Sequence, residues 1–242
     1  MIRGCRVLED AAAVAREAGE RVVAIARRSI AERGALRLAL SGGSTPVALY
    51  RTLATSPLCE RIEWERVTFL FADERAVPRG DRDRNDRLAD ETLLGPLGIE
   101  EERILRMRGD AADLDAAALE YEAHLETPLD LAILGVGPDG HTASIFPRAP
   151  ASAERERRCV AVDDSPKPPP RRLTLAPRAL REARAALVLV TGEEKAAAVA
   201  AAFDPSSTPV SCPASLLRAR EWLIDHAAAR ELPPALRITA GS

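Results

Sequence analysis

The chain has few aromatic residues, no closely spaced cysteines, almost no lysine and no long apolar run. Aromatic side chains make up 3% of its 242 residues, and runs such as Ala185 to Val190 are far too short to span a membrane. The cysteines show neither a C-x-x-C pair nor metal-ligand spacing; they are Cys5, Cys59, Cys159 and Cys212. We therefore expect reduced thiols in a cytoplasmic protein with no metal site and no membrane partner.

Net charge and chain length limit the possible partners and the number of domains. The formal net charge of -3 and the pI of about 5.8 give no general attraction to nucleic acid, so we expect no such partner. A hydrophobic fraction of 46% over 242 residues predicts one large domain, 1–242, with a real core. Both monomer and small homo-oligomer remain open. The basic residues are nearly all arginine, so Lys167 and Lys195 are candidates for sites that need a compact ammonium.

Apolar runs and helical patterns alternate along much of the chain. Strands are predicted at 36–40, 67–71, 129–134, 159–162, 172–175, 187–190 and 222–224. Helices are predicted at 10–32, from Pro46 through Leu53, and at 85–94, 111–125 and 192–203. The first strand then follows about 35 residues that hold one helix. This alternation predicts an α/β fold: a doubly wound, mostly parallel sheet with helices on both faces.

The most informative segment is 134–147, which reads LGVGPDGHTASIFP. An apolar strand ends in a glycine-rich turn that contains Gly137 and Gly140, and His141 follows directly. Glycines let a ligand approach the main chain closely, and histidine is the side chain whose ordinary pKa lies near neutrality. We therefore predict that His141 is a catalytic base. Asp139 either orients this histidine or caps the turn.

Two other interpretations of this turn compete with a catalytic one. A lone histidine in a turn is often purely structural. The glycines also match G-x-G-x-x-G after a strand, with Asp163 as a candidate acidic partner for a dinucleotide ribose. Pro147 and Pro150, however, fall where the crossover helix should begin, and proline inside a helix costs about 3 kcal/mol. We therefore disfavour dinucleotide binding.

Three further segments lie at predicted strand ends or helix starts, where an open α/β sheet binds its ligand. SGGSTP, at 41–46, offers backbone N–H groups and a helix N-terminus to an anion, through Ser41, Gly42, Gly43, Ser44 and Thr45. FADER, at 71–75, supplies Asp73 and Arg75, and GEEK, at 192–195, supplies Lys195. Lys167 and Arg172 lie in or beside a proline-rich surface loop, 166–170. An ordinary helix cap and solvated surface charges are the alternatives for these segments.

The motifs SGGSTP, FADERAVP, GVGPDGHTASIFP, SPKPPPRRLTL and GEEKA, in this order, resemble those of the 6-phosphogluconolactonases. The resemblance runs from about Leu40 to about Pro213. It implies a Rossmann-like α/β sandwich similar to the sugar-phosphate isomerases and deaminases. It also implies hydrolysis of 6-phospho-D-glucono-1,5-lactone to 6-phosphogluconate in the oxidative pentose phosphate pathway, with no metal or organic cofactor.

The resemblance also assigns residues. His141 matches the family's general base, and Arg75 matches the arginine of its DER element. Basic family positions fall on Lys167, Arg172 and Lys195. The sugar-phosphate lactone is thus the expected small-molecule partner.

One position departs from the pattern. Where the family has Ser-Asn-Tyr after the DER element, this chain has Arg84, Asn85 and Asp86. Asn85 is kept, but the hydroxyl and the aromatic ring are absent, which questions the substrate contacts of that loop.

Two rival functions can be weighed on single features. Deaminases of the same fold carry a glutamate five residues beyond the histidine, where this chain has Phe146. A non-enzymatic sugar-phosphate sensor would need a DNA-binding module, for which the acidic chain leaves no room before its first predicted strand.

Overall fold

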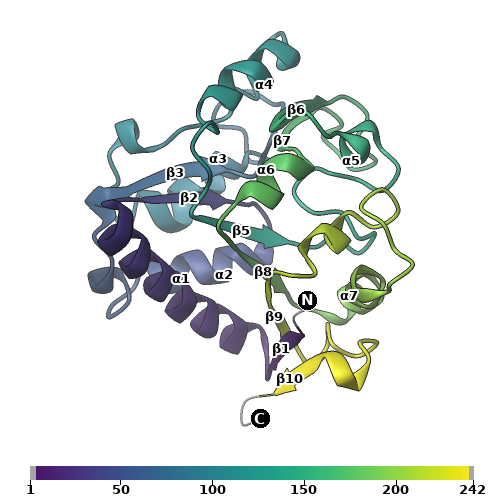
Figure 1. The fold of residues 1–242 in the computed structure, drawn as a ribbon. Coiled ribbons are helices and arrows are strands. Elements are labelled where there is room, and N and C mark those ends of the chain that lie inside the picture. The colour runs from purple at the N-terminus through teal and green to yellow at the C-terminus, as the bar shows by residue number, and fades with distance from the viewer. Residues whose placement is uncertain (1–3, 240–242) are drawn as a thin grey trace.

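The computed structural model describes residues 4–239, and within them a seven-stranded parallel sheet forms the centre (Figure 1). Its strand order is β10-β1-β9-β8-β5-β2-β3. These strands are β1 (Cys5–Leu8), β2 (Leu36–Leu40), β3 (Val67–Phe71), β5 (Leu131–Gly135), β8 (Ala185–Val190), β9 (Glu221–Asp225) and β10 (Arg237–Thr239). The central strands are buried and almost wholly apolar, as expected for parallel strands covered on both faces.

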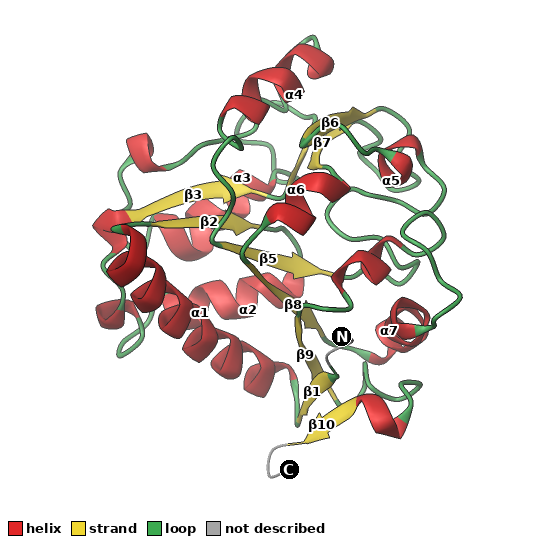
Figure 2. Ribbon diagram, in the orientation of Figure 1, coloured by secondary structure: helices red, strands yellow, loops and turns green. Residues whose placement is uncertain are grey.

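Helices cover this sheet on both faces, as Figure 2 shows by colour. Helices α1 and α2 pack together and against the sheet on one side, whereas α6 lies on the other side with α4 beyond it (Figure 1). The helices are α1 (Ala11–Arg33), α2 (Ser44–Leu53), α3 (Asn85–Ala89), α4 (Leu114–Ala123), α5 (Pro150–Ala153), α6 (Pro177–Glu182) and α7 (Ala196–Phe203). Helix α1 is delimited locally: the Asp10 carboxylate accepts from the amide of Ala13 at 2.7 Å, and Gly34 ends it in the left-handed conformation.

A small antiparallel sheet, in the order β4-β7-β6, joins the large one. It consists of β4 (Asp73–Arg75), β6 (Cys159–Val162) and β7 (Arg172–Leu175). Ala72 connects the two sheets, because its amide donates to Leu40 and its carbonyl accepts from Leu175, both at 2.7 Å. The chain thus passes from β3 into β4 in one residue, which turns the FADER segment away from the large sheet and over the ends of its strands.

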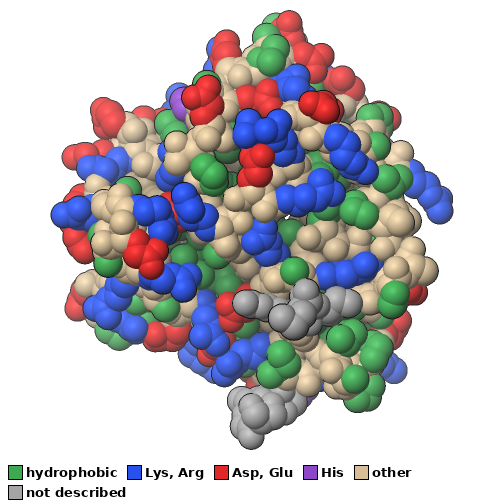
Figure 3. Space-filling model, in the orientation of Figure 1, with side chains coloured by type: hydrophobic (Ala, Val, Ile, Leu, Met, Phe, Trp, Pro, Cys, Tyr) green, Lys and Arg blue, Asp and Glu red, His purple; other side chains and the backbone are tan. Residues whose placement is uncertain are grey.

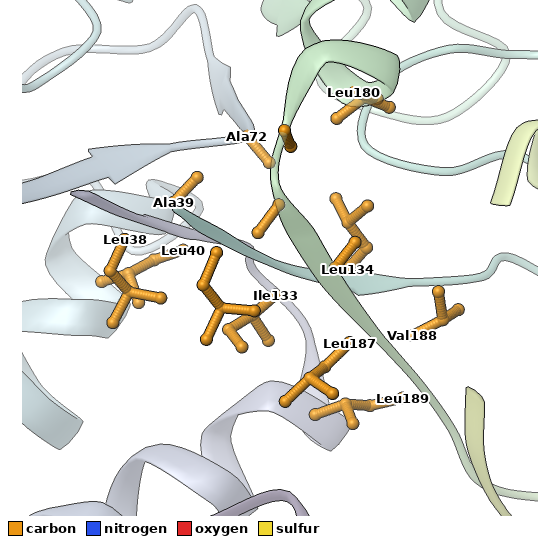
Figure 4. Packing of buried hydrophobic residues seen from close by; sticks show 14 of the residues in the cluster. Leu38, Ala39, Leu40, Ala72, Ile133, Leu134, Leu180, Leu187, Val188 and Leu189 are labelled. Carbon is orange, nitrogen blue, oxygen red and sulfur yellow. The ribbon is translucent and has the colours of Figure 1, made fainter. Parts of the chain in front are cut away.

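The core shows the alternation that a sheet requires (Figure 4). One set of side chains points toward α1 and α2: Leu38, Leu40, Ile133, Leu187 and Leu189. Another set points toward α6: Ala39, Ala72 and Leu134, with Leu180 of the helix itself facing them. All these residues are at most 1% exposed, so the sheet is buried on both sides.

The doubly wound α/β fold predicted from the alternation is confirmed, with differences at the edges. The expectation that one helix alone precedes Leu36 is wrong, because β1 lies before α1; four residues are too few to show a period. Strand β10 was missed for the same reason. Helix α2 begins at Ser44, not at Pro46, and the proline still lies in the first turn, where its missing N–H costs nothing.

Three other helices differ in detail from the pattern. The segment 85–94 is α3 followed by a π-helical turn, Asp90–Leu94. Helix α4 is shorter than 111–125, because Asp113 caps its N-terminus by accepting from the amide of Ala116 at 3.0 Å. A 3-10 turn, Glu193–Lys195, precedes α7.

Basic and acidic side chains are interspersed over the face seen in Figure 3. Among residues 4–239, no helix is both long and apolar enough to cross a membrane. The same residues contain no cluster of three or more His, Cys, Asp or Glu side chains arranged to hold a metal ion.

Candidate active site

A cavity of about 190 Å³ opens at the carboxyl ends of β2, β5 and β8. All four motifs singled out in the sequence reach it, together with the proline-rich loop. The predicted residues that line it are Ser41, Gly42, Gly43, Ser44, Thr45, Asp73, Arg75, Gly137, His141, Lys167, Arg172 and Lys195. Three predicted residues stand behind the lining: Asn85, Asp139 and Gly140. The expected convergence of strand ends on one site therefore exists in this fold.

His141 and Asp139 form a pair at the mouth of the glycine turn. The Nδ1 atom of His141 lies 2.5 Å from Oδ1 of Asp139, which leaves the opposite ring nitrogen, Nε2, for the cavity. Burial alone would raise the pKa of Asp139, but the hydrogen bond and charge of His141, with the charge of Lys167, hold that pKa well below its ordinary value. Asp139 therefore stays ionised and fixes the orientation of the imidazole, so orientation is the better of its two predicted roles.

The glycines of the turn make room for this pair. A Cβ on Gly137 would lie 2.0 Å from His141 and 2.6 Å from the Asp139 carboxylate. Gly140 has φ of +83°, and a Cβ there would lie 2.9 Å from Sγ of Cys212. The main chain closes the turn, since the amide of Gly137 donates to the carbonyl of His141 at 2.8 Å. The helix that follows the turn, α5, has only four residues, and the next strand, β6, lies in the small sheet, which agrees with the rejection of a dinucleotide site.

Phe146 supports both the histidine and a cation, a role that the sequence did not reveal. Its ring lies 4.7 Å from the ring of His141, tilted by 37°. The guanidinium of Arg172 lies over the same ring, 5.5 Å from its centroid. Because Phe146 is only 1% exposed, it forms a fixed apolar floor under the two functional groups.

The SGGSTP loop presents a helix N-terminus to the cavity. Ser41 shapes the loop rather than facing a ligand: its amide donates to the Tyr50 hydroxyl at 2.9 Å, and its own hydroxyl donates to Ile133 at 2.7 Å. The amides of Ser44 and Thr45 lie in the first turn of α2, where a helix offers them no acceptor. These amides and the helix dipole favour an anion at this end of the cavity.

Asp73, which lines the cavity, and Asn85, which lies behind it, hold the loops together. The amide of the Asn85 side chain donates to the Asp73 carbonyl at 2.8 Å and to its Oδ1 at 3.2 Å. The Ser144 hydroxyl donates to Oδ2 of Asp73 at 2.6 Å. A Cβ on Gly42 would lie 1.9 Å from the Asn85 side chain, so the glycine loop packs directly on Asn85.

Four cations face the cavity from three sides. Arg75 and Arg172 are cross-strand partners in the small sheet. The ammonium of Lys167 lies 3.3 Å from Oδ1 of Asp139 and 3.4 Å from Nδ1 of His141. Burial and the charge of Lys167 lower the pKa of Lys195, although Glu194 opposes this shift. The cavity therefore combines the ionised carboxylate of Asp139, paired with the imidazole of His141, with a rim of four cationic side chains.

Comparisons with known proteins place the chain in a family. Residues 9–224 match the model of the glucosamine-6-phosphate isomerases/6-phosphogluconolactonases. The chain belongs to this family. The resemblance predicted from the motifs is thus confirmed.

Relatives of the family extend over nearly the whole chain. The protein named 6-phosphogluconolactonase of Mycobacterium tuberculosis is 40% identical, over 96% of this chain and 100% of that protein. The one of Streptomyces coelicolor is 37% identical, over 95% of each chain. The structure of 6-phosphogluconolactonase from Trypanosoma cruzi has a TM-score of 0.83 with 29% identity, covering 95% of this chain and 97% of that one.

A monomeric glucosamine-6-phosphate deaminase shares the fold, with a TM-score of 0.82 at 21% identity over 94% of this chain and 99% of that one. Fold alone therefore does not separate the two activities that the family name contains.

Within this family, the departure at Arg84 and Asp86 has a structural explanation. Both side chains are buried away from the cavity, where two guanidinium nitrogens of Arg84 lie 2.8 and 2.7 Å from the two oxygens of Asp86. The Glu74 carboxylate accepts from the amides of Asn85 and Asp86, each at 2.8 Å, and so joins β4 to the start of α3. An internal ion pair therefore occupies the place of the expected serine and tyrosine.

Proposed function

We propose that the protein hydrolyses 6-phospho-D-glucono-1,5-lactone to 6-phosphogluconate. The observation that carries this proposal is the Asp139–His141 pair in a cavity rimmed by cations. An oriented imidazole suits activation of water, and the cations suit a phosphorylated sugar. The relatives named 6-phosphogluconolactonase support the same assignment. On the isolated cysteines we place the enzyme in the cytoplasm.

In the proposed reaction, neutral His141 accepts a proton on Nε2 from a water molecule that attacks C1 of the lactone. The carbonyl oxygen becomes an oxyanion, which backbone N–H groups of the turn or a rim cation stabilise. When the carbonyl re-forms, the bond between C1 and the ring oxygen breaks, and the imidazolium returns its proton to that oxygen. Asp139 stays ionised throughout and holds Nδ1, so the ring needs no reorientation between the two transfers.

The phosphate of the substrate is proposed to bind at the start of α2. The first-turn amides of Ser44 and Thr45 supply donors, and the helix dipole adds a partial positive charge. Thr45 is held in place by the Thr191 hydroxyl, 2.8 Å away. Lysine and arginine side chains of the rim neutralise the remaining negative charge of the phosphate. A phosphate anchored there fixes the ring of the lactone relative to His141.

Phe146 favours the lactonase over the deaminase. The position where the deaminases carry a glutamate holds this buried ring, which packs against the His141 ring at a tilt of 37°. A phenyl ring supplies no proton for sugar ring opening, whereas lactone hydrolysis needs no second acid–base group at that place.

The test measures lactone hydrolysis at slightly acidic pH, where spontaneous hydrolysis is slow, with substrate generated in situ from glucose 6-phosphate. We expect the wild type to accelerate ring opening and His141→Ala to lose about 10²- to 10⁴-fold in kcat, the share of a general base, with little change in KM. His124→Ala is the matched control, because His124 is exposed at the end of α4 and its carbonyl accepts a hydrogen bond from Arg37 near the amino end of β2, whereas the cavity lies at the carboxyl end of that strand. A wild type no faster than the spontaneous reaction, or a His141→Ala variant with near-normal turnover, refutes the proposal.

A further inference from the structure

Arg172 lines the cavity, yet its guanidinium is almost fully engaged by the protein. Nε donates to the carbonyl of Pro169 at 3.1 Å. Nη2 donates to the carbonyls of Lys167 at 3.0 Å and Pro168 at 3.2 Å. Since a guanidinium has five N–H donors, three are committed to consecutive carbonyls of the proline-rich loop.

A fourth donor connects Arg172 to Ser144, in the segment that follows His141. Its Nη1 donates to the Ser144 hydroxyl at 3.3 Å, and that hydroxyl donates to Asp73 at 2.6 Å. Arg172, Ser144 and Asp73 are at most 5% exposed, so solvent does not compete for these bonds. A continuous series of hydrogen bonds therefore links Asp73 of β4, through Ser144 and Arg172, to the proline-rich loop.

The loop held in this way carries Lys167, whose ammonium contacts the Asp139–His141 pair. Other hydrogen bonds of this segment lie within it: the amide of Ser165 donates to Pro170 at 2.9 Å, the amide of Lys167 donates to the Ser165 hydroxyl at 3.2 Å, and that hydroxyl donates to the Lys167 carbonyl at 2.9 Å. At the end of the segment the amide of Ala76 donates to the carbonyl of Arg171 at 2.9 Å, four residues from Lys167. The three carbonyl contacts of Arg172 are thus a principal link between the Lys167 backbone and the rigid sheet.

We propose that Arg172 is a positioning residue, which with Ser144 and Asp73 holds the proline-rich loop so that Lys167 sits on the Asp139–His141 pair. This role differs from the substrate contact that the motif suggested for Arg172 and Asp73. The part concerning catalysis rests on the proposed function, whereas the part concerning loop order does not.

A double-mutant cycle on kcat/KM tests the catalytic part. Arg172→Lys keeps the charge but cannot span three carbonyls and a hydroxyl, so we expect a loss of about tenfold, mostly in kcat, comparable to that of Lys167→Met. If Arg172 acts through Lys167, the double variant stays within about threefold of Lys167→Met alone. Multiplied losses of about a hundredfold, or a loss confined to KM, would show direct action on the substrate and overturn the proposal.

Two further measurements keep the result interpretable. If Arg172→Lys fails to fold, Ser144→Ala replaces it in the cycle, since it removes only the middle link of the chain. Amide hydrogen exchange of segment 163–171 requires no activity: we expect Ser165 and Lys167 to exchange at least tenfold faster in Arg172→Lys. Arg171→Lys is the matched control, because Arg171 pairs only with exposed Asp163 at the surface. Unchanged amide hydrogen exchange in Arg172→Lys would refute the loop-ordering role. If the wild type is inactive but exchange is faster in Arg172→Lys, only the proposed function is refuted.

Discussion

The substitution Gly137→Ala separates the geometry of His141, the proposed general base, from the stability of the fold. The new Cβ would lie 2.0 Å from the His141 ring, so the ring must retreat by roughly 1.4 Å to reach the ordinary contact distance of 3.4 Å. Gly137 does not have the positive φ that would strain an alanine, and the His141 side chain is 18% exposed, so the ring can be displaced toward solvent at the expense of its hydrogen bond to Asp139. We therefore expect unfolding to become easier by only about 1–2 kcal/mol.

The expected cost in activity is much larger. A displacement of about 1 Å costs on the order of a hundredfold, and a fully lost general base costs 10²- to 10⁴-fold, so kcat should fall at least a hundredfold. Lactone hydrolysis and thermal unfolding are measured on Gly137→Ala, His141→Ala and the double variant. In the His141→Ala background the added methyl meets no ring, so Gly137→Ala should lower the residual rate no further. Near-normal turnover of the single variant, or a second large loss in the double variant, refutes this reasoning.

Three further predictions concern the support of the site. Asp139→Asn removes the carboxylate that holds Nδ1 of His141, so kcat should fall about tenfold. Because the pKa of Asp139 lies well below its ordinary value, this carboxylate stays ionised and the loss should be the same at neutral and mildly acidic pH; a loss that disappears at mildly acidic pH would show that the carboxylate titrates there. Arg84→Met removes the buried cation that pairs with Asp86 and Glu74 and leaves Asp86 only the longer 3.8 Å contact with Arg106, so the free energy of unfolding should fall by about 3 kcal/mol in urea titrations. An unchanged free energy of unfolding would show that the Arg84 pair contributes nothing to stability. Tyr50→Phe leaves the amide of Ser41 without its acceptor, so the free energy of unfolding should fall by about 1–3 kcal/mol. Because Ser41 shapes the proposed phosphate-binding loop, KM should rise more than kcat falls. An unchanged KM would show that this loop does not bind the phosphate.

Much of the site could be predicted because parallel strands deliver their carboxyl ends to one edge. Each motif follows a buried strand or begins a helix, so Thr45, Asp73, His141 and Lys195 meet although they are far apart in sequence. The glycine-rich turn could also be recognised from the sequence. Glycine is needed at position 137 because other groups approach the main chain closely there.

The rest depends on contacts between distant segments. A sequence does not show whether an arginine is exposed, so Arg84 gave no sign of its buried pair with Asp86. The same limit hid the direction of the Arg172 donors, which face loop carbonyls. Phe146 was judged by what it cannot do in proton transfer, whereas its packing against two functional groups appears only in three dimensions.

The position of β1 has a consequence for the order in which the protein can assemble during synthesis. Its two neighbours in the sheet, β9 and β10, begin at Glu221 and Arg237, so the first described strand can pair only after the last two have been synthesised. The strands beneath the cavity, β2, β3, β5 and β8, are complete once Val190 has emerged. The strands beneath the cavity can therefore pair with one another before β1 pairs with β9 and β10. If synthesis stalls after Val190, β1 is left without a partner strand.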